Sequence, residues 1–259
     1  MHAQRDADSV SSESVDTPVV QQFYPRVTSF RSRRSSLNDS QQEVWERLWP
    51  RLGTQARPRS GEGEGEGEGD QAQLLDTRAW FGRDAPIILE IGGGTGTSTL
   101  AMAQSEPHVD VVAVEVYRRG LAQLLSAIDR EGVGNIRMVR GDGVDVLERM
   151  FPTASLTGVR VFFPDPWPKA RHHKRRLLQQ HTVALIADRL QPGGVFHAAT
   201  DHSGYAEQIA ATGDAEPRLR RAETGEALPI SVQRPITKYE TKAHDVGSAV
   251  TELVWVRRP

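Results

Sequence analysis

Acidic residues follow five apolar runs in this chain, and their placement is the first sign of chemistry. Glu90, Glu115, Asp142, Asp165 and Asp201 each stand at or just after such a run. If the runs are strands of one parallel sheet, their carboxyl ends lie at one edge, where open α/β sheets bind ligands. The pattern therefore predicts carboxylates gathered at one rim of a sheet.

A glycine-rich turn follows the first run, with Gly92, Gly94 and Gly96 at alternate positions. Glycine lets a backbone approach a ligand where a Cβ would collide with it. The dinucleotide fingerprint G-x-G-x-x-G needs a glycine where this chain has Thr97, which argues against a pyrophosphate and against an NAD-dependent oxidoreductase. Glu115 follows 23 residues after Gly92, a position from which a carboxylate can accept hydrogen bonds from ribose hydroxyls. The turn and Glu115 together predict an adenosine-like ligand such as S-adenosylmethionine (AdoMet), whose sulfonium tolerates nearby acids such as Glu90. The alternative is that the glycines form only a tight turn.

The stretch 162–169, FFPDPWPK, is the most informative part of the sequence. Its three prolines fix φ near about −65° and remove three N–H donors, so we expect a rigid loop. Asp165 stands between two of these prolines and close to Trp167. A rigid acid beside an aromatic ring suits the grip of a planar heterocycle. A turn-forming aspartate beside a packed tryptophan is the alternative.

A run of cations follows this loop directly. We expect a helix over about 174–190, so the run lies at its N-terminus, where cations oppose the helix macrodipole unless an anion offsets them. A phosphate backbone is such an anion, and helix N-termini favour phosphate. The predicted RNA-contacting residues are Arg171, His172, His173, Lys174, Arg175 and Arg176. A solvated basic face of a helix is the alternative.

The elements that must position these residues alternate between strands and helices after residue 85. Strands are predicted at 87–91, 111–115, 136–139, 159–163, 194–199 and 251–256, with amphipathic stretches between most of them. This alternation is typical of βαβ units, in which helices cover both faces of a parallel sheet. We therefore predict an α/β fold with a doubly wound, mostly parallel sheet.

The remainder of the chain divides into regions by composition. We predict a disordered tail and basic arm at 1–35, a short helix region at 36–60, a Gly/Glu linker at 61–70 and the main domain at 71–259. In the second region, Asn38-Asp39-Ser40 is a suitable N-cap for a helix over 39–49.

Composition excludes several function classes. The chain of 259 residues has a net charge of −2, but its acids concentrate near the N-terminus and in the Gly/Glu segment, so the remaining body is basic and suits a polyanionic partner. The chain has no cysteine, which excludes disulfides and thiolate catalysis. Its histidines have no metal-ligand spacing, so we predict no metal. The absence of a long apolar run or an N-terminal signal pattern favours a cytoplasmic protein without a membrane span.

The sequence resembles the bacterial tRNA (guanine-N7-)-methyltransferase family. The similarity rests on Leu89–Gly96, Val114–Val116, Phe162–Arg176, His197–Asp201 and Arg234–Glu240. It implies a class I AdoMet-dependent methyltransferase with a Rossmann-like, seven-stranded sheet, which methylates guanine 46 in the tRNA variable loop. It implies tRNA as partner, and we predict no obligatory protein partner.

The resemblance also implies a role for each matching residue. Glu90, Glu115 and Asp142 would bind the amino acid end, ribose and adenine of AdoMet, together with the glycine turn, and Asp165 would be the catalytic acid. The implied substrate-binding residues are Lys169, Asp201, Thr237, Lys238, Tyr239 and Glu240. The chain departs from the family at 241–243, Thr-Lys-Ala in place of an Arg-Gly-like pair, and in its long N-terminal extension.

Guanine N7 carries a lone pair and no proton, so its methylation requires no general base. We expect Asp165 to accept hydrogen bonds from the guanine N1–H and exocyclic amine, and so to align N7 with the methyl group. Two other functions stay open. One is AdoMet-dependent methylation of another RNA, a small molecule or an exocyclic amine, although amine methylation favours an (N/D)-P-P-(Y/F) loop. The other is non-catalytic RNA binding by a methyltransferase fold.

Overall fold

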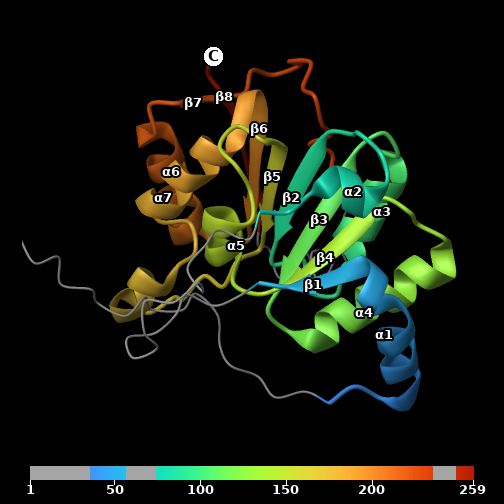
Figure 1. Ribbon diagram of the computed structural model, residues 1–259. Coiled ribbons are helices and arrows are strands. Elements are labelled where there is room, and N and C mark those ends of the chain that lie inside the picture. The colour runs from blue at the N-terminus through green and yellow to red at the C-terminus, as the bar shows by residue number, and fades with distance from the viewer. Residues whose placement is uncertain (1–35, 57–73, 236–248) are drawn as a thin grey trace, which may run out of the picture.

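The computed structural model describes residues 36–56, 74–235 and 249–259, in which one sheet lies between two layers of helices (Figure 1). The strands are β1 Gly53–Gln55, β2 Ile87–Ile91, β3 Asp110–Glu115, β4 Ile136–Arg140, β5 Leu156–Phe162, β6 Leu190–Thr200, β7 Leu219–Arg221 and β8 Thr251–Arg257. The helices are α1 Asp39–Leu52, α2 Thr77–Phe81, α3 Thr97–Ser105, α4 Arg118–Glu131, α5 Gly143–Arg149, the 3-10 helix η1 Ala170–Arg175, α6 Gln180–Arg189 and α7 Ser203–Ala215. The predicted disordered tail at 1–35, the Gly/Glu linker at 61–70 and the substrate segment 237–240 lie outside the described residues.

The strands are ordered β1-β4-β3-β2-β5-β6-β8-β7. The pairs from β1 through β6 are parallel, while β8 runs antiparallel to both β6 and β7. The chain moves outward on one side of β2 through β3 and β4, and on its other side through β5 and β6. The junction of β2, β3 and β5 is therefore the topological switch point, where a doubly wound sheet opens a crevice for ligands.

The predicted α/β fold with a mostly parallel sheet is confirmed. The six strands predicted by position correspond to β2, β3, β4, β5, β6 and β8. With β7 they make the seven that the resemblance implies for the main domain, and β1 adds an eighth within the described residues. Two short strands, β1 and β7, have no counterpart in the sequence prediction. Each is three residues long, too short for hydrophobic periodicity to reveal it.

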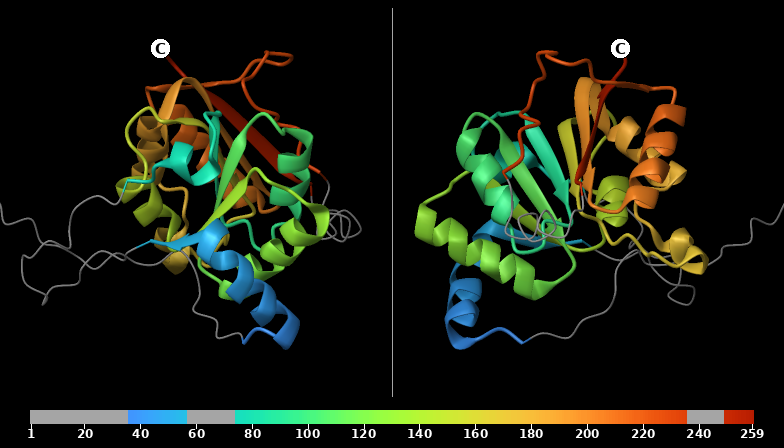
Figure 2. Two further views of the ribbon diagram at one scale, coloured as in Figure 1. Left: turned by 45° about the vertical axis from the view of Figure 1, so that its right-hand side comes forward. Right: turned by 180° about the vertical axis from the view of Figure 1, so that it is seen from behind.

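Side chains of the sheet divide between two apolar layers, because successive residues of a strand point to opposite faces. On one face, Leu89 and its neighbours pack with α5, α6 and α7. On the other, Ile88 and its neighbours pack with α1, α3 and α4. The right view of Figure 2, from behind the molecule, shows helices on both sides of the sheet. Every residue of β2 is buried, which explains why its sequence is a continuous apolar run interrupted only by Glu90.

The N-terminal region packs against the main domain. Asn38 caps α1 through a bond from the Gln41 backbone N–H, as predicted, and the helix runs three residues beyond the expected end. Buried Leu48 and Leu52 join the α4 side of the core, and β1 pairs with β4. Residues 39–55 thus extend the same sheet and helix layer and do not form a separate body.

The basic run is not at the N-terminus of an α-helix, so the predicted helix over 174–190 is wrong at its start. Ala170–Arg175 form the short 3-10 helix η1, and α6 begins only at Gln180. Arg176 between them has extended backbone, with φ −60° and ψ 136°. The chain turns inward here, because Leu178 is fully buried and its N–H donates to the Tyr205 hydroxyl. The macrodipole argument for bound phosphate therefore does not apply to this run.

Candidate active site

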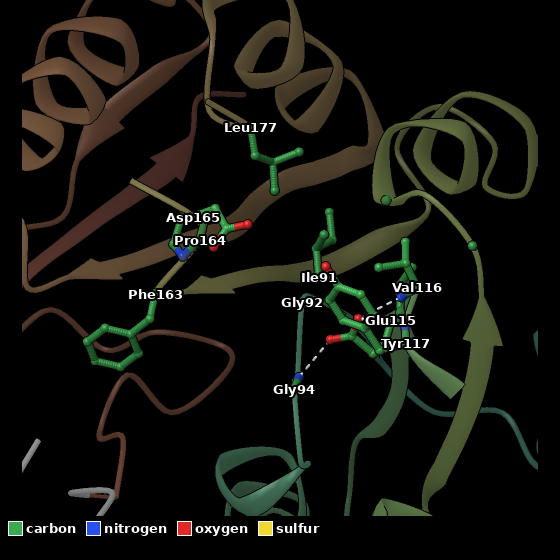
Figure 3. A pocket seen from close by; sticks show the side chains of 13 residues that line it. Ile91, Gly92, Gly94, Glu115, Val116, Tyr117, Phe163, Pro164, Asp165 and Leu177 are labelled. Atoms are coloured by element: carbon green, nitrogen blue, oxygen red, sulfur yellow. Dashed lines mark hydrogen bonds between the residues drawn. The ribbon is translucent and has the colours of Figure 1, made fainter. Parts of the chain in front are cut away.

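A pocket of about 300 Å³ opens at the switch point, where β2, β3 and β5 end (Figure 3). Its walls come from the turn after β2, the end of β3, the turn before α5 and the proline-rich loop after β5. The lining residues are Ile91, Gly92, Gly94, Val114, Glu115, Val116, Tyr117, Gly141, Gly143, Phe163, Pro164, Asp165 and Leu177. The rim at which the sequence predicts carboxylates is thus hollowed, and two of those carboxylates face into it.

The glycine turn forms one wall in a conformation that other residues rarely adopt. Gly92 and Gly94 have φ of +81° and +57°, and both line the pocket. Gly120 on α4 allows the turn to pack closely against that helix, because a Cβ at position 120 would lie 2.1 Å from the Gly94 carbonyl oxygen. Gly96 lies outside the pocket lining and is the N-cap residue of α3, where it lies close to Leu124. The turn is therefore shaped by both local backbone and close packing on α4.

Glu115 holds this wall together at the end of β3. One of its carboxylate oxygens accepts the Gly94 N–H at 3.0 Å, and the other accepts the N–H groups of Val116 and Tyr117 at 2.7 and 2.9 Å. Burial raises the pKa of Glu115, while these three hydrogen bonds favour its ionised form. The carboxylate is thereby fixed in orientation at the pocket wall.

Glu90 lies deeper, on β2, with 2% of its surface exposed. Its Oε1 accepts a hydrogen bond from the Thr99 hydroxyl at 2.8 Å, but Oε2 is buried without a hydrogen-bond partner in the described structure. Burial raises the pKa of Glu90, against the opposing effects of Thr99 and the charge of Arg160. A buried acceptor without a partner is costly, which makes Oε2 a candidate for a ligand's donor group.

Asp142 has a local structural contact. Its side chain accepts the Val144 N–H at 2.8 Å and caps α5, while Gly141 and Gly143 on either side of it line the pocket. Gly143 must be small here, since a Cβ would lie 2.3 Å from Ile91. The predicted adenine contact is not tested by this geometry and stays a prediction.

Asp165 projects from the proline-rich loop on the wall opposite Glu115, as Figure 3 shows. The negative charge of Asp165 contributes to the raised pKa of Glu115, so the two carboxylates interact across the pocket. Phe163 and Trp167 on either side of Asp165 have positive φ, +50° and +43°. Such strain in non-glycine residues persists only where surrounding contacts impose it, and it concentrates at functional loops.

The start of this loop packs against a polar network in which the Arg234 and His197 side chains are buried and Glu252 is exposed. Arg234 lies over the rings of Phe162 and Phe163, at 5.5 and 4.8 Å, and donates to Glu252 at 2.8 Å. The second oxygen of Glu252 lies 2.5 Å from Nε2 of buried His197. Arg234 stands three residues before the predicted substrate segment 237–240, which lies outside the described residues. The network therefore links the proline-rich loop to the part of the chain that leads to this segment.

The basic run lies beside the loop with its members in different environments. Arg171 and Lys174 are exposed, His172 and His173 are half-buried, and the Arg175 guanidinium lies 4.2 Å from the Trp167 ring centre. Arg176 is 3% exposed and makes its hydrogen bonds inside the protein, a placement that does not favour the predicted RNA contact, which stays a prediction. Lys169 and Asp201 are exposed and do not line the pocket.

Sequence reasoning missed part of the pocket wall. Tyr117 and Leu177 line it but carry no motif, and only proximity to Glu115 or to the basic run could have indicated them. Gly120 was also missed, although a glycine in the first turn of an amphipathic helix is a recognisable sign of close backbone packing.

Comparison with known proteins gives the family. A family model described as "Putative methyltransferase" matches residues 84–253. A tRNA (guanine-N(7)-)-methyltransferase of Mycolicibacterium gilvum (strain PYR-GCK) is 68% identical over 92% of this chain and 89% of its own. That of Mycolicibacterium paratuberculosis (strain ATCC BAA-968 / K-10) is 61% identical over 100% of this chain and 98% of its own. The chain belongs to the tRNA (guanine-N(7)-)-methyltransferase family.

The resemblance drawn from the glycine turn and the PDPWPK loop is thus confirmed for this family member. Among solved structures, the 16S rRNA methyltransferase KamB is similar with a TM-score of 0.48 and 16% identity, covering 72% of this chain and 95% of that chain. Within the described ranges, no helix is long and apolar enough to cross a membrane. The same residues contain no group of three or more His, Cys, Asp or Glu side chains suited to a metal ion.

Proposed function

We propose that this methyltransferase transfers the methyl group of AdoMet to N7 of guanine 46 in the variable loop of tRNA. The observation that carries the proposal is the pair of carboxylates Asp165 and Glu115 on opposite walls of one pocket at the switch point. The names of relatives at 61–68% identity support the same reaction.

The residues that line the pocket, and those beside it in the chain, fit AdoMet. Glu90 Oε2, a buried acceptor without a partner among the described residues, suits the ammonium of the amino acid end. The fixed carboxylate of Glu115 suits the ribose hydroxyls, and the exposed backbone of Gly92 and Gly94 allows close approach. Asp142 would contact the adenine from the edge beside Gly141. AdoMet, when bound, supplies an electrophilic methyl group on a sulfonium.

Asp165 is the proposed catalytic residue, and its role is orientation. Its carboxylate accepts hydrogen bonds from the guanine N1–H and exocyclic amine, so that N7 points toward the methyl group. The lone pair of N7 forms the new N–C bond while the C–S bond breaks and its electrons pass to sulfur. No proton leaves N7, and the positive charge that develops on the guanine is offset by the carboxylate. Alignment alone can lower the barrier by about 7–11 kcal/mol.

The tRNA is held outside the pocket. Arg171 and Lys174 are exposed cations on η1, which follows the proline-rich loop directly. The residues proposed to contact phosphates are these two together with His172, His173 and Arg175. Lys169, Asp201 and Thr237, Lys238, Tyr239 and Glu240 are proposed substrate contacts. The target base leaves the tRNA stack to reach the pocket. A cytoplasmic location follows from the tRNA substrate.

The proposal is tested with purified protein, labelled AdoMet and two tRNA transcripts that differ only at position 46. Nuclease digestion and mass spectrometry should find 7-methylguanosine in the transcript with G46 and none in the transcript with A46. Equal methylation of both transcripts would contradict the assigned position. Methylation of neither, with AdoMet bound, would favour the non-catalytic RNA-binding alternative.

A further inference from the structure

Arg176 is the one member of the basic run 171–176 that the fold buries. Its neighbours Arg171 and Lys174 are exposed, whereas Arg176 is 3% exposed. Burying a guanidinium is unfavourable unless its N–H groups are satisfied, so its partners inside the protein reveal what it does.

Those partners come from the proline-rich loop at 162–169 and from α7. Nε of Arg176 donates to the Pro166 carbonyl oxygen at 2.8 Å. Nη1 donates to the Gly204 carbonyl oxygen at 3.2 Å and to Gln208 Oε1 at 2.7 Å. The guanidinium also lies over the Tyr205 ring, 4.8 Å from its centre. Arg176 thus ties the loop to the start of α7, which is itself packed in the core through fully buried Tyr205 and Ile209.

The bond to Pro166 fixes the chain immediately after Asp165. Proline locks its own φ and restricts the residue before it, so a fixed Pro166 carbonyl limits the backbone of Asp165 as well. Asp165 itself is exposed to the pocket. The direction of the Asp165 carboxylate therefore depends on the loop backbone, and Arg176 holds that backbone through its hydrogen bond to Pro166.

We propose that Arg176 is a positioning residue that aims Asp165 at the guanine, and that it is not an RNA contact. The inference rests on the proposed function, in which Asp165 orients the base. Arg176 directs its charge-assisted hydrogen bonds to neutral carbonyl and amide oxygens, so it acts through geometry and not through a partner charge. The fork of the guanidinium matches the three acceptors from two directions, a geometry that a lysine ammonium cannot reproduce.

Two substitutions at Arg176 separate the two roles. Arg176→Lys keeps the charge and loses the fork, while Arg176→Gln removes the charge. If Arg176 positions Asp165, the single-turnover rate of methyl transfer at saturating AdoMet and tRNA falls by about 10- to 100-fold in both variants, the scale expected for a small misplacement of a catalytic group. The dependence of tRNA affinity on salt stays as in the wild type. If Arg176 contacts phosphate, Arg176→Lys stays close to the wild type and only Arg176→Gln makes the salt dependence shallower.

Variants on α7 guard against a simple loss of folding. Gln208→Ala removes one acceptor of Arg176 and should lower the rate by a smaller factor than Arg176→Lys, whereas Glu207→Ala, exposed on the same helix, should match the wild type. A purely structural role would lower the amplitude of the single-turnover reaction, because fewer molecules are folded, and leave its rate constant unchanged. Lys174→Ala serves as the RNA-contact comparison, since it should alter the salt dependence.

A wild-type rate constant in Arg176→Lys, with methylation by the wild type intact, would overturn the positioning role alone. A fall in amplitude without a fall in rate constant would overturn it too. Absence of tRNA methylation by the wild-type protein would instead refute the proposed function, and this inference would fall with it.

Discussion

The backbone N–H of Gly94 donates to the carboxylate of Glu115 at 3.0 Å, and this bond joins the turn after β2 to the end of β3. The two parts of the proposed cofactor site are therefore one structural unit. Because Glu115 also accepts two N–H groups from its own strand end, the glycine turn is fixed to a carboxylate that cannot swing away. A change at either residue should affect both the shape of the turn and the binding of AdoMet.

The first prediction concerns Glu115. Glu115→Ala should weaken AdoMet binding by about 1.5–3 kcal/mol, the usual value of hydrogen bonds to a charged group. Titration calorimetry measures this, and Glu207→Ala on the surface of α7 is the matched control. An unchanged affinity would contradict the assignment of Glu115 to the cofactor.

The second prediction concerns the pH dependence of stability through Glu90, whose pKa burial raises above the ordinary value of 4.5. Between 4.5 and the raised pKa, the folded protein holds a proton that the unfolded chain has released, so the free energy of unfolding falls as pH rises through this window. Glu90→Gln removes this term. Urea unfolding from pH 4.5 upward should therefore show the variant gaining stability relative to the wild type as pH rises. A difference in the free energy of unfolding that stays constant across that range would show that burial does not raise the pKa of Glu90.

The third prediction concerns the exposed cations. The double variant Arg171→Ala with Lys174→Ala should make the slope of log tRNA affinity against log salt shallower by about 1–2 units. Each phosphate contact that is lost means that fewer counterions are released when tRNA binds. AdoMet affinity should stay constant. Arg78→Ala removes a cation from α2, a helix whose Trp80 carbonyl oxygen accepts a hydrogen bond from Arg137 near the start of β4, outside the pocket lining, and should leave the slope as it is. Equal slopes in all three proteins would mean that the run is only solvated.

The fourth prediction concerns the packing of the glycine turn. Gly120→Ala places a Cβ 2.1 Å from the Gly94 carbonyl oxygen, so the turn or α4 must shift. The free energy of unfolding should fall by about 1–3 kcal/mol, the usual cost of overpacking, and AdoMet should bind more weakly. Gly134→Ala meets no atom within 4 Å and should change neither quantity. A neutral Gly120→Ala variant would show that the close approach is not needed.

The sequence predicts at which edge of the sheet the pocket lies, but it does not predict all of the contacts around the pocket. Long apolar runs such as 87–91 identify central strands because both faces are buried, and the residues that end them must then meet at one rim. The same reasoning cannot see β1 or β7, whose three residues pair only because tertiary neighbours provide an edge. It also treats Arg175 and Arg176 alike, as adjacent cations. Only the inward turn of the chain toward Leu178 buries the second of them, and that turn has no local signal.

The central claim is that Asp165 aligns guanine for methyl transfer, and the most direct measurement compares the wild type with Asp165→Ala. Both proteins are incubated with labelled AdoMet and the tRNA transcript, and the yield of 7-methylguanosine is followed in a single turnover, while calorimetry records AdoMet affinity. Loss of methyl transfer in Asp165→Ala, with AdoMet affinity changed far less than in Glu115→Ala, is the predicted result. Methyl transfer at the wild-type rate by Asp165→Ala would contradict the account.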